Sequence, residues 1–217
     1  RRKFRIHPWS EITRTFFRDR HIALVGPQIA TPRRPQVESH RTICLHWEDL
    51  LATRISVIGA GLAGSEAAWQ LASRGYDVIL HEMRPGHSTP AHHTDRAAEM
   101  VCSNSFKSDD PGSATGILKA ELRRLGSFIL ETAEKARVPA GQSLAVDRNA
   151  FAERVTQALR AHPHITWIHE LVEKPDPCVP TLIATGPLTA DPLADWLAEA
   201  CGSHRLFFYD AIAPIVE

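Results

Sequence analysis

The sequence Ile55-Ser-Val-Ile58, followed directly by Gly59-Ala-Gly-Leu-Ala-Gly64, decides the fold. The β-branched run predicts a strand, and the residues from the glycine loop to Arg74 have the composition of a helix. A second strand candidate, Val78-Ile-Leu80, leads into Glu82. Strand, tight turn, helix and strand within about 30 residues make a βαβ unit. Because such crossovers are right-handed, we expect the two strands to be parallel.

The glycines have the spacing G-x-G-x-x-G of a dinucleotide-binding loop, and Glu82 lies 18 residues after the last of them. Gly59 permits a tight turn, Gly61 permits a pyrophosphate to approach the backbone, and Gly64 permits close packing of helix and strand. Free N–H groups at the helix start favour phosphate, and Glu82 would accept hydrogen bonds from a ribose hydroxyl. The predicted cofactor-binding residues are Gly59, Ala60, Gly61, Leu62, Ala63, Gly64 and Glu82. A glycine-rich turn without a ligand is the alternative.

Strands and helices continue to alternate downstream, so we expect an α/β, Rossmann-like domain with a parallel sheet. Residues 84–114 are polar and proline-containing, and they predict a long loop. Asp147 predicts the N-cap of a helix that runs through Arg160. Asp191 predicts the N-cap of another helix, with Pro192 at its first helical position. Further strands are predicted at Leu144-Ala-Val146, Ile165-Thr-Trp-Ile168 and Thr181-Leu-Ile-Ala184.

One apolar stripe predicts a single long helix after this loop. Its members are spaced 4, 3, 4, 3 and 4 residues apart, as expected for one buried helix face. Gly126 lies within the stretch and weakens the prediction slightly. The stripe consists of Leu118, Leu122, Leu125, Ile129, Thr132 and Ala136.

The late strand ends in Ala184-Thr-Gly186, a recurring feature of flavoproteins in which the chain returns to the cofactor. The chain contains no second nucleotide fingerprint. Both observations favour FAD over NAD, although Ala-Thr-Gly alone is equally consistent with an ordinary strand end.

Composition and charge exclude several classes of protein. The 25 basic and 25 acidic residues cancel, so no global basic field for nucleic acid exists. No apolar run approaches the ~20 residues that span a membrane. Without a C-x-x-C pair, neither a zinc site nor a disulfide framework is indicated, and we expect reduced thiols in a cytoplasmic protein. The four cysteines are Cys44, Cys102, Cys178 and Cys201.

Charge also divides the chain. Residues 1–54 carry six more basic than acidic residues, and residues 55–217 carry six more acidic than basic ones. Residues 1–54 lack a strand or helix period, so we interpret them as a disordered extension, with an RNA-binding arm as the alternative. Residues 55–217 are the predicted FAD-binding domain. Because Pro214-Ile-Val-Glu217 ends on a strand-like run, we expect this domain to be incomplete at its C-terminus.

The predicted loop contains two groups of reactive side chains. His92 and His93 are adjacent, cannot easily both face one ion, and have no third ligand at a suitable spacing, so no metal site is predicted. Cys102 stands beside small hydrogen-bonding residues in Cys102-Ser-Asn-Ser105, which suits a nucleophile near a cofactor. A buried, inert cysteine is the alternative reading of the same residues.

Several blocks of residues 55–217 together resemble the bacterial folate- and FAD-dependent tRNA (uracil-5-)-methyltransferases. The glycine loop is shared by many flavoproteins, whereas the histidine and cysteine blocks are much more specific. The resemblance does not extend to residues 1–54. It rests on Gly59-Ala-Gly-Leu-Ala-Gly-Ser-Glu-Ala-Ala-Trp-Gln70, Glu82-Met-Arg-Pro85, Thr89-Pro-Ala-His-His-Thr-Asp95, Cys102-Ser-Asn-Ser105, Val138-Pro-Ala-Gly141, Leu144-Ala-Val-Asp-Arg148, Ile183-Ala-Thr-Gly-Pro-Leu-Thr189 and Tyr209-Asp-Ala-Ile-Ala-Pro-Ile-Val-Glu217.

The resemblance implies an activity. In this family 5,10-methylenetetrahydrofolate supplies one carbon, reduced flavin supplies electrons, NAD(P)H is the expected reductant, and the product is 5-methyluridine in the tRNA T-loop. Cys102 matches a functional cysteine that either attacks the uracil or assists proton removal. The resemblance also implies that Arg84 and Gly186 lie at the cofactor. A second functional cysteine of the family lies beyond residue 217, so we expect this chain to bind FAD but to be inactive alone.

Three alternatives remain at this point. A sister family of FAD-binding tRNA wobble-uridine modification proteins shares the glycine loop, but Glu82-Met-Arg-Pro85 and Cys102-Ser-Asn-Ser105 argue against it. A cofactor-binding fragment without turnover belongs to a different class. Ribosomal RNA is also a conceivable substrate, because no residue here reads the RNA. The sequence does not indicate the oligomeric state.

Overall fold

The computed structural model describes residues 54–202. The predictions made for residues 1–53 and for the C-terminal run at 209–217 lie outside the described residues. Within the described part, no helix has both the length and the apolar character that crossing a membrane requires.

A four-stranded parallel sheet forms the centre of the fold and confirms the predicted fold class. The strand order is β6-β2-β1-β7, and β1 pairs with β2 in the register Ile55 to Val78. The strands are β1 (Ile55–Ile58), β2 (Val78–Glu82), β6 (Ile165–His169) and β7 (Thr181–Ile183). Because the strands are parallel, their carboxyl ends meet at one edge, where ligands of such folds bind.

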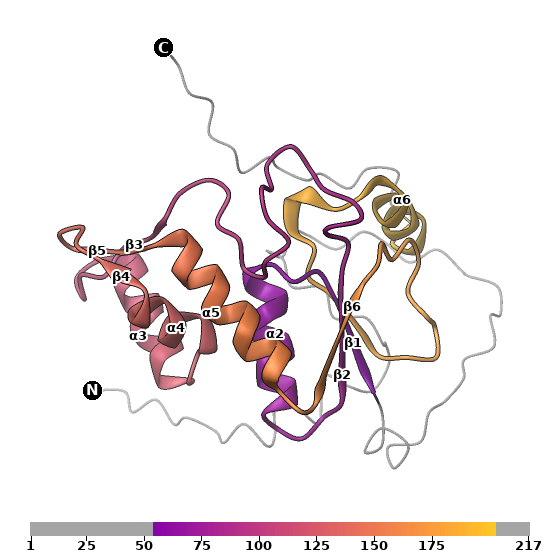
Figure 1. Cartoon of the computed structure of the whole chain (residues 1–217), viewed down its shortest axis with the longest axis horizontal. Coiled ribbons are helices and arrows are strands. Elements are labelled where there is room, and N and C mark those ends of the chain that lie inside the picture. The colour runs from indigo at the N-terminus through magenta and orange to yellow at the C-terminus, as the bar shows by residue number, and fades with distance from the viewer. Residues whose placement is uncertain (1–53, 203–217) are drawn as a thin grey trace, which may run out of the picture. The chain divides into compact units, whose positions relative to one another are not determined.

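Helices cover both faces of this sheet (Figure 1). On one side, α2 (Leu62–Ala72) and α5 (Arg148–Ala161) pack over the main core, which contains Val57, Leu80 and Phe151 at 0% exposure. On the other side, α6 (Asp191–Ala200) places Leu193 and Leu197 against Ile58 in a smaller core. The side chains of β1 thus contribute to both cores, as expected for a central strand of a doubly covered sheet.

A second, antiparallel sheet has the order β3-β5-β4. Its strands are β3 (Ser105–Ser108), β4 (Arg137–Val138) and β5 (Ser143–Val146). The prediction that 84–114 is one continuous loop is therefore wrong for Ser105–Ser108. This strand forms by pairing with β5, in the register Ser105 to Ala145, and such a long-range pairing leaves no local period in the sequence.

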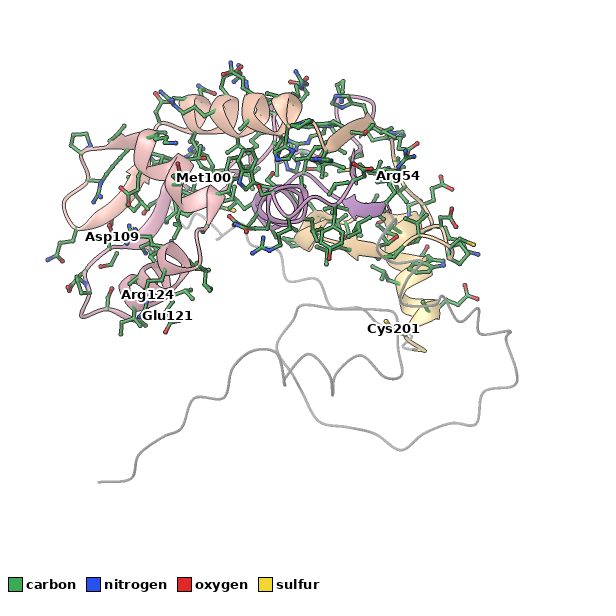
Figure 2. All side chains as sticks on the ribbon, turned by 90° about the horizontal axis from the view of Figure 1, so that it is seen from below. Arg54, Met100, Asp109, Glu121, Arg124 and Cys201 are labelled. Atoms are coloured by element: carbon green, nitrogen blue, oxygen red, sulfur yellow. The ribbon has the colours of Figure 1, made fainter. Side chains whose placement is uncertain are left out.

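The prediction of one long helix with one buried stripe is also wrong. Two helices stand in its place, α3 (Ala114–Arg124) and α4 (Phe128–Lys135). Gly126 between them adopts φ +73°, a left-handed conformation that ends a helix. Leu118 and Leu125 are 54% and 69% exposed, whereas Ile129 and Ala136 are buried in the main core, so only part of the stripe faces a common core. Arg124, the last residue of α3, is labelled in Figure 2.

The predicted N-cap of α5 is confirmed, and that of α6 lies one residue earlier than predicted. The Asp147 side chain accepts hydrogen bonds from the N–H groups of Asn149 and Ala150, as a true N-cap does. For α6 the N-cap is Ala190, not Asp191, which becomes the first helical residue. A carboxylate in the first turn still complements the helix dipole, so the sequence signal was correct to within one residue.

Candidate functional site: a glycine loop and its carboxylate

The glycine loop connects β1 to α2 as predicted, and each glycine occupies a position that a larger residue would disturb or fill. Gly59 has φ +98°, and a Cβ there would lie 2.9 Å from the Ala184 oxygen. A Cβ on Gly64 would lie 1.8 Å from the Gly59 oxygen, so only glycine permits this approach of helix to loop. At Gly61 a Cβ would meet no atom within 4 Å. Gly61 therefore borders open space.

The start of α2 is built to receive acceptors from outside the helix. Gly61 is its N-cap and supplies no side-chain cap. In the first backbone hydrogen bond of α2, the Ser65 N–H donates to the Gly61 carbonyl oxygen at 2.9 Å. The first-turn N–H groups of Leu62, Ala63 and Gly64 have no acceptor within the helix, as helix geometry requires. Together with the helix dipole, these donors suit a phosphate.

Glu82 ends β2 and points back at the glycine loop. The residue is 5% exposed, and its Oε2 accepts the Ala60 N–H at 3.0 Å. Oε1 accepts hydrogen bonds from Arg84, from Nε at 2.8 Å and from the backbone N–H at 3.1 Å. Burial raises the pKa of Glu82, but the Arg84 guanidinium and these hydrogen bonds outweigh it and hold the pKa below its ordinary value. Glu82 is therefore ionised at neutral pH.

Arg84 is buried between two carboxylates. Its side chain reaches Glu82 on one side, and on the other Nη1 donates to Glu99 Oε2 at 2.9 Å and to the Thr94 carbonyl oxygen at 3.1 Å. The residue is only 2% exposed. The structure thus assigns Arg84 a bracing position behind Glu82, and its predicted contact with a cofactor remains a prediction.

A pocket opens at the carboxyl ends of the parallel strands. The glycine loop and the end of β2 line one part of it, and segments after β6 and β7 line the rest. The lining residues of greatest interest are Gly59, Gly61, Glu82, Arg84, His92, Glu170, Val172, Thr185 and Leu188. The pocket thus lies where the fold predicts a ligand.

His92 brings the predicted loop into this pocket. Its Nδ1 lies 2.8 Å from Thr89 Oγ1, and partial burial, followed by the charge of Arg84, lowers the pKa of its imidazole. The ring is therefore neutral at neutral pH. Among residues 54–202, no group of three or more His, Cys, Asp or Glu side chains is placed to hold a metal ion.

Gly186 and Cys102 lie outside the lining of the pocket. Gly186 has φ +67° and begins a short 3₁₀ helix, η2 (Gly186–Leu188), next to the lining residue Thr185. Cys102 is exposed, in the turn just before β3. Its loop is fixed to β5 nearby, because Asn104 exchanges backbone and side-chain hydrogen bonds with Val146 at 2.9 and 3.1 Å. The predicted roles of Gly186 and Cys102 remain predictions.

Sequence reasoning missed two parts of the site. Glu170 and Val172 line the pocket because they follow the carboxyl end of β6. Their position after a predicted parallel strand is the signal that could have identified them. Glu99 had no local signal, because its partners Arg84 and Thr94 are brought to it by the course of the loop.

Comparison with known protein families identifies the family of the segment that contains this site. The family model described as glucose inhibited division protein A matches residues 54–217. The chain belongs to this family. The match begins at the residue before β1 and therefore excludes nearly all of the predicted extension.

Several curated proteins are similar to this chain in sequence. The methylenetetrahydrofolate–tRNA-(uracil-5-)-methyltransferase TrmFO of Halalkalibacterium halodurans is 56% identical over 163 residues, which cover 75% of this chain and 37% of that protein. The TrmFO of Bacillus subtilis (strain 168) gives the same identity and coverage over 163 residues. The chain thus spans little more than a third of the length of these relatives.

A solved structure of Aquifex aeolicus GidA also aligns with the chain. It matches 55% of this chain and 20% of that protein, with 17% sequence identity and a TM-score of 0.42. A TM-score this low adds nothing about function.

Proposed function

We propose that the chain is the FAD-binding part of a folate- and FAD-dependent tRNA (uracil-5-)-methyltransferase. The observation that carries the proposal is the 56% identity with TrmFO relatives over a segment that contains the glycine loop, Glu82 and Cys102. The relatives' name supplies the donor and the substrate class, and the pocket at the glycine loop supplies a place for a nucleotide cofactor.

The residues of the pocket fit FAD. The open space at Gly61 leaves room for a pyrophosphate against the first-turn N–H groups of α2. The Glu82 carboxylate, ionised and held by Ala60 and Arg84, still has lone pairs for a ribose hydroxyl. Gly186 follows the strand end at the same sheet edge, where glycine permits close backbone approach. When bound, the flavin supplies electrons for reduction of the transferred carbon.

Cys102 is the proposed reactive residue. Uracil C5 is a poor nucleophile until a group adds at C6, and a thiolate can make that addition. Assistance in removing the C5 proton is the other role that a thiolate can have. The exposed position of Cys102 leaves it accessible to a macromolecular substrate. The target base must be exposed from folded RNA before either step.

The finer parts of the proposal concern substrates and location. We infer 5,10-methylenetetrahydrofolate as carbon donor, NAD(P)H as reductant, a T-loop uridine of tRNA as acceptor, and a cytoplasmic site of action. Residues 1–54 form a separate extension, and residues 55–217 form the cofactor-binding domain. Because the chain spans 37% of the relatives' length, methyl transfer is proposed to require the remaining part.

A second candidate is a cofactor-binding chain without turnover. It is favoured by the coverage, since the chain spans only 37% of the relative's length, while the described residues 54–202 already contain the glycine loop, Glu82 and the pocket that they line. Bound flavin without any methyl transfer, even when the chain is joined to the remaining part of a TrmFO relative, would identify this candidate.

The experiment is a chimera. Residues 54–217 replace the corresponding N-terminal part of the Bacillus subtilis TrmFO, and incorporation of a labelled one-carbon unit from methylenetetrahydrofolate into transcript tRNA is measured. We expect methylation that disappears with Cys102→Ala while bound flavin remains. A ribosomal RNA transcript tests the other RNA substrate. A chimera that binds FAD but methylates neither RNA would contradict the proposed activity.

A further inference from the structure

Glu99 lies outside the lining of the pocket, yet it is connected to Glu82. The Glu99 side chain is 12% exposed. Its Oε1 accepts the His93 N–H at 2.9 Å, and its Oε2 accepts hydrogen bonds from the Thr94 N–H at 3.2 Å and the Thr94 hydroxyl at 3.0 Å. These bonds fix the carboxylate in one orientation.

Arg84 connects this carboxylate to Glu82. Glu99 Oε2 receives Arg84 Nη1 at 2.9 Å, and Glu82 Oε1 receives Arg84 Nε at 2.8 Å. A guanidinium is planar and rigid, so carboxylates on both sides of it determine its position and its tilt. Since Arg84 is 2% exposed, its charge depends on these two partners in place of water.

The same segment also contacts the glycine loop directly. The Ala98 N–H donates to the Ala60 carbonyl oxygen at 2.8 Å, while the Ala60 N–H donates to Glu82. Residues 93–99 therefore hold both the loop that faces the phosphates and the arginine behind the ribose-binding carboxylate.

We propose that Glu99 is a positioning residue for nucleotide recognition, which acts through Arg84 to fix the Glu82 carboxylate toward the ribose. The proposal rests on the proposed function, in which this pocket binds FAD. In Glu99→Gln the carboxamide keeps one acceptor for His93, but its NH₂ group faces the donors of Arg84 and Thr94. Arg84 then loses one of its two anionic partners and the constraint on its tilt. Glu82 keeps its hydrogen bonds from the Ala60 and Arg84 backbone N–H groups, but it loses the fixed orientation of the Arg84 Nε donor.

The test is FAD affinity of the 217-residue chain, measured by titration with flavin fluorescence. We expect Glu99→Gln to bind FAD about tenfold more weakly, the effect of losing one charged hydrogen bond. Glu121→Gln is the matched control, because Glu121 lies exposed on α3 and its side chain makes no hydrogen bond or ion pair with the other described residues (Figure 2). Its affinity should be unchanged.

A double-mutant cycle separates positioning from general damage. If Glu99 acts through Glu82, then Glu99→Gln should weaken FAD binding by less than about twofold further in a Glu82→Gln background. Additive losses would overturn the proposal, because a merely structural role acts regardless of residue 82. Equal FAD affinity of Glu99→Gln and the unaltered chain would overturn it as well.

Two further outcomes are distinguishable. If the unaltered chain does not bind FAD, the proposed function fails and this inference fails with it. If Glu99→Gln does not fold, Glu99→Asp carries the test, because it keeps the charge but withdraws the carboxylate from Arg84 by one methylene. Severalfold weaker FAD binding by Glu99→Asp supports the proposal, and unchanged binding overturns it.

Discussion

The carboxylate of Glu66, on α2, accepts the backbone N–H of Ile129 at 2.8 Å, in the first turn of α4. The same side chain accepts the Phe128 N–H at 3.1 Å and the Ser127 hydroxyl at 2.8 Å. One acidic residue thus caps a helix that begins more than sixty positions later in the chain. It attaches the α3–α4 part to the helix that follows the glycine loop.

Glu66→Ala should therefore destabilise the fold. We expect a loss of about 1–3 kcal/mol in the free energy of unfolding, because partly buried N–H groups lose their acceptor. The measurement is urea unfolding followed by circular dichroism. Glu131→Ala is the control, since the 68% exposed Glu131 pairs only with Lys135 among the described residues, and it should cost less than about 1 kcal/mol. Equal losses in both variants would contradict the capping role.

Gly64→Ala should damage the fold itself. The added Cβ would lie 1.8 Å from the Gly59 oxygen, so helix and loop must separate. We expect a loss of about 1–3 kcal/mol in unfolding free energy, typical of an overpacked core. Gly61→Ala adds the same methyl group where no atom lies within 4 Å, and it should cost less than about 1 kcal/mol. Similar stability of the two variants would refute the close approach.

These sites show how far the sequence predicts the structure. The strand, glycine loop, helix and Glu82 were predictable because each signal lies within one βαβ unit. Asp147 was predictable as an N-cap for the same reason, since the N–H groups it caps are two and three residues away.

The errors share a physical cause. The break at Gly126 depends on a left-handed conformation and on the cap from Glu66, which is distant in sequence. The 3.6-residue period of apolar side chains reveals neither the conformation of a glycine nor a cap from another helix. The Glu99–Arg84 ion pair was likewise absent from the sequence prediction, because only the folded loop brings that carboxylate to the guanidinium.

The free energy of unfolding should fall in acid, because the buried carboxylates of Glu82 and Glu99 become protonated. Burial raises the pKa of Glu82 and of Glu99, but hydrogen bonds, with the charge of Arg84, outweigh it and lower both pKa values below the ordinary 4.5. Their contribution is complete above about pH 4.5, the unfolded value, and is lost as pH falls through the folded values. Unfolding free energies of the cofactor-free chain at pH 7 and pH 4 measure this. The decrease should be smaller in Glu99→Gln, and an equal decrease would count against the assigned ionic network.

Cys102 should react in the native chain. Because Cys102 is exposed, a thiol reagent should modify it without denaturant. The measurement uses a variant in which the other cysteines, Cys44, Cys178 and Cys201, are replaced by serine. Modification should leave FAD affinity within about twofold, since Cys102 does not line the pocket. Protection of Cys102 from the reagent, or loss of flavin after modification, would assign it to the cofactor pocket instead.

Removal of residues 1–54 should leave the domain folded. The family match begins at residue 54, and the predicted extension has neither a strand nor a helix period. We expect the melting temperature to change by only a few degrees, the shift of about 1 kcal/mol in a unit of this size. Loss of soluble, flavin-binding protein on deletion would show that the extension belongs to the fold.

The most direct test of the central claim is FAD binding by the chain and by Gly61→Val. Valine places a branched side chain in the open space at the start of α2, where the pyrophosphate is proposed to bind. We predict flavin absorbance and saturable FAD binding for the unaltered chain. For Gly61→Val we predict at least about a tenfold loss of affinity, with a melting temperature within a few degrees of the unaltered chain. If Gly61→Val binds FAD with unchanged affinity, the glycine loop is not the cofactor site.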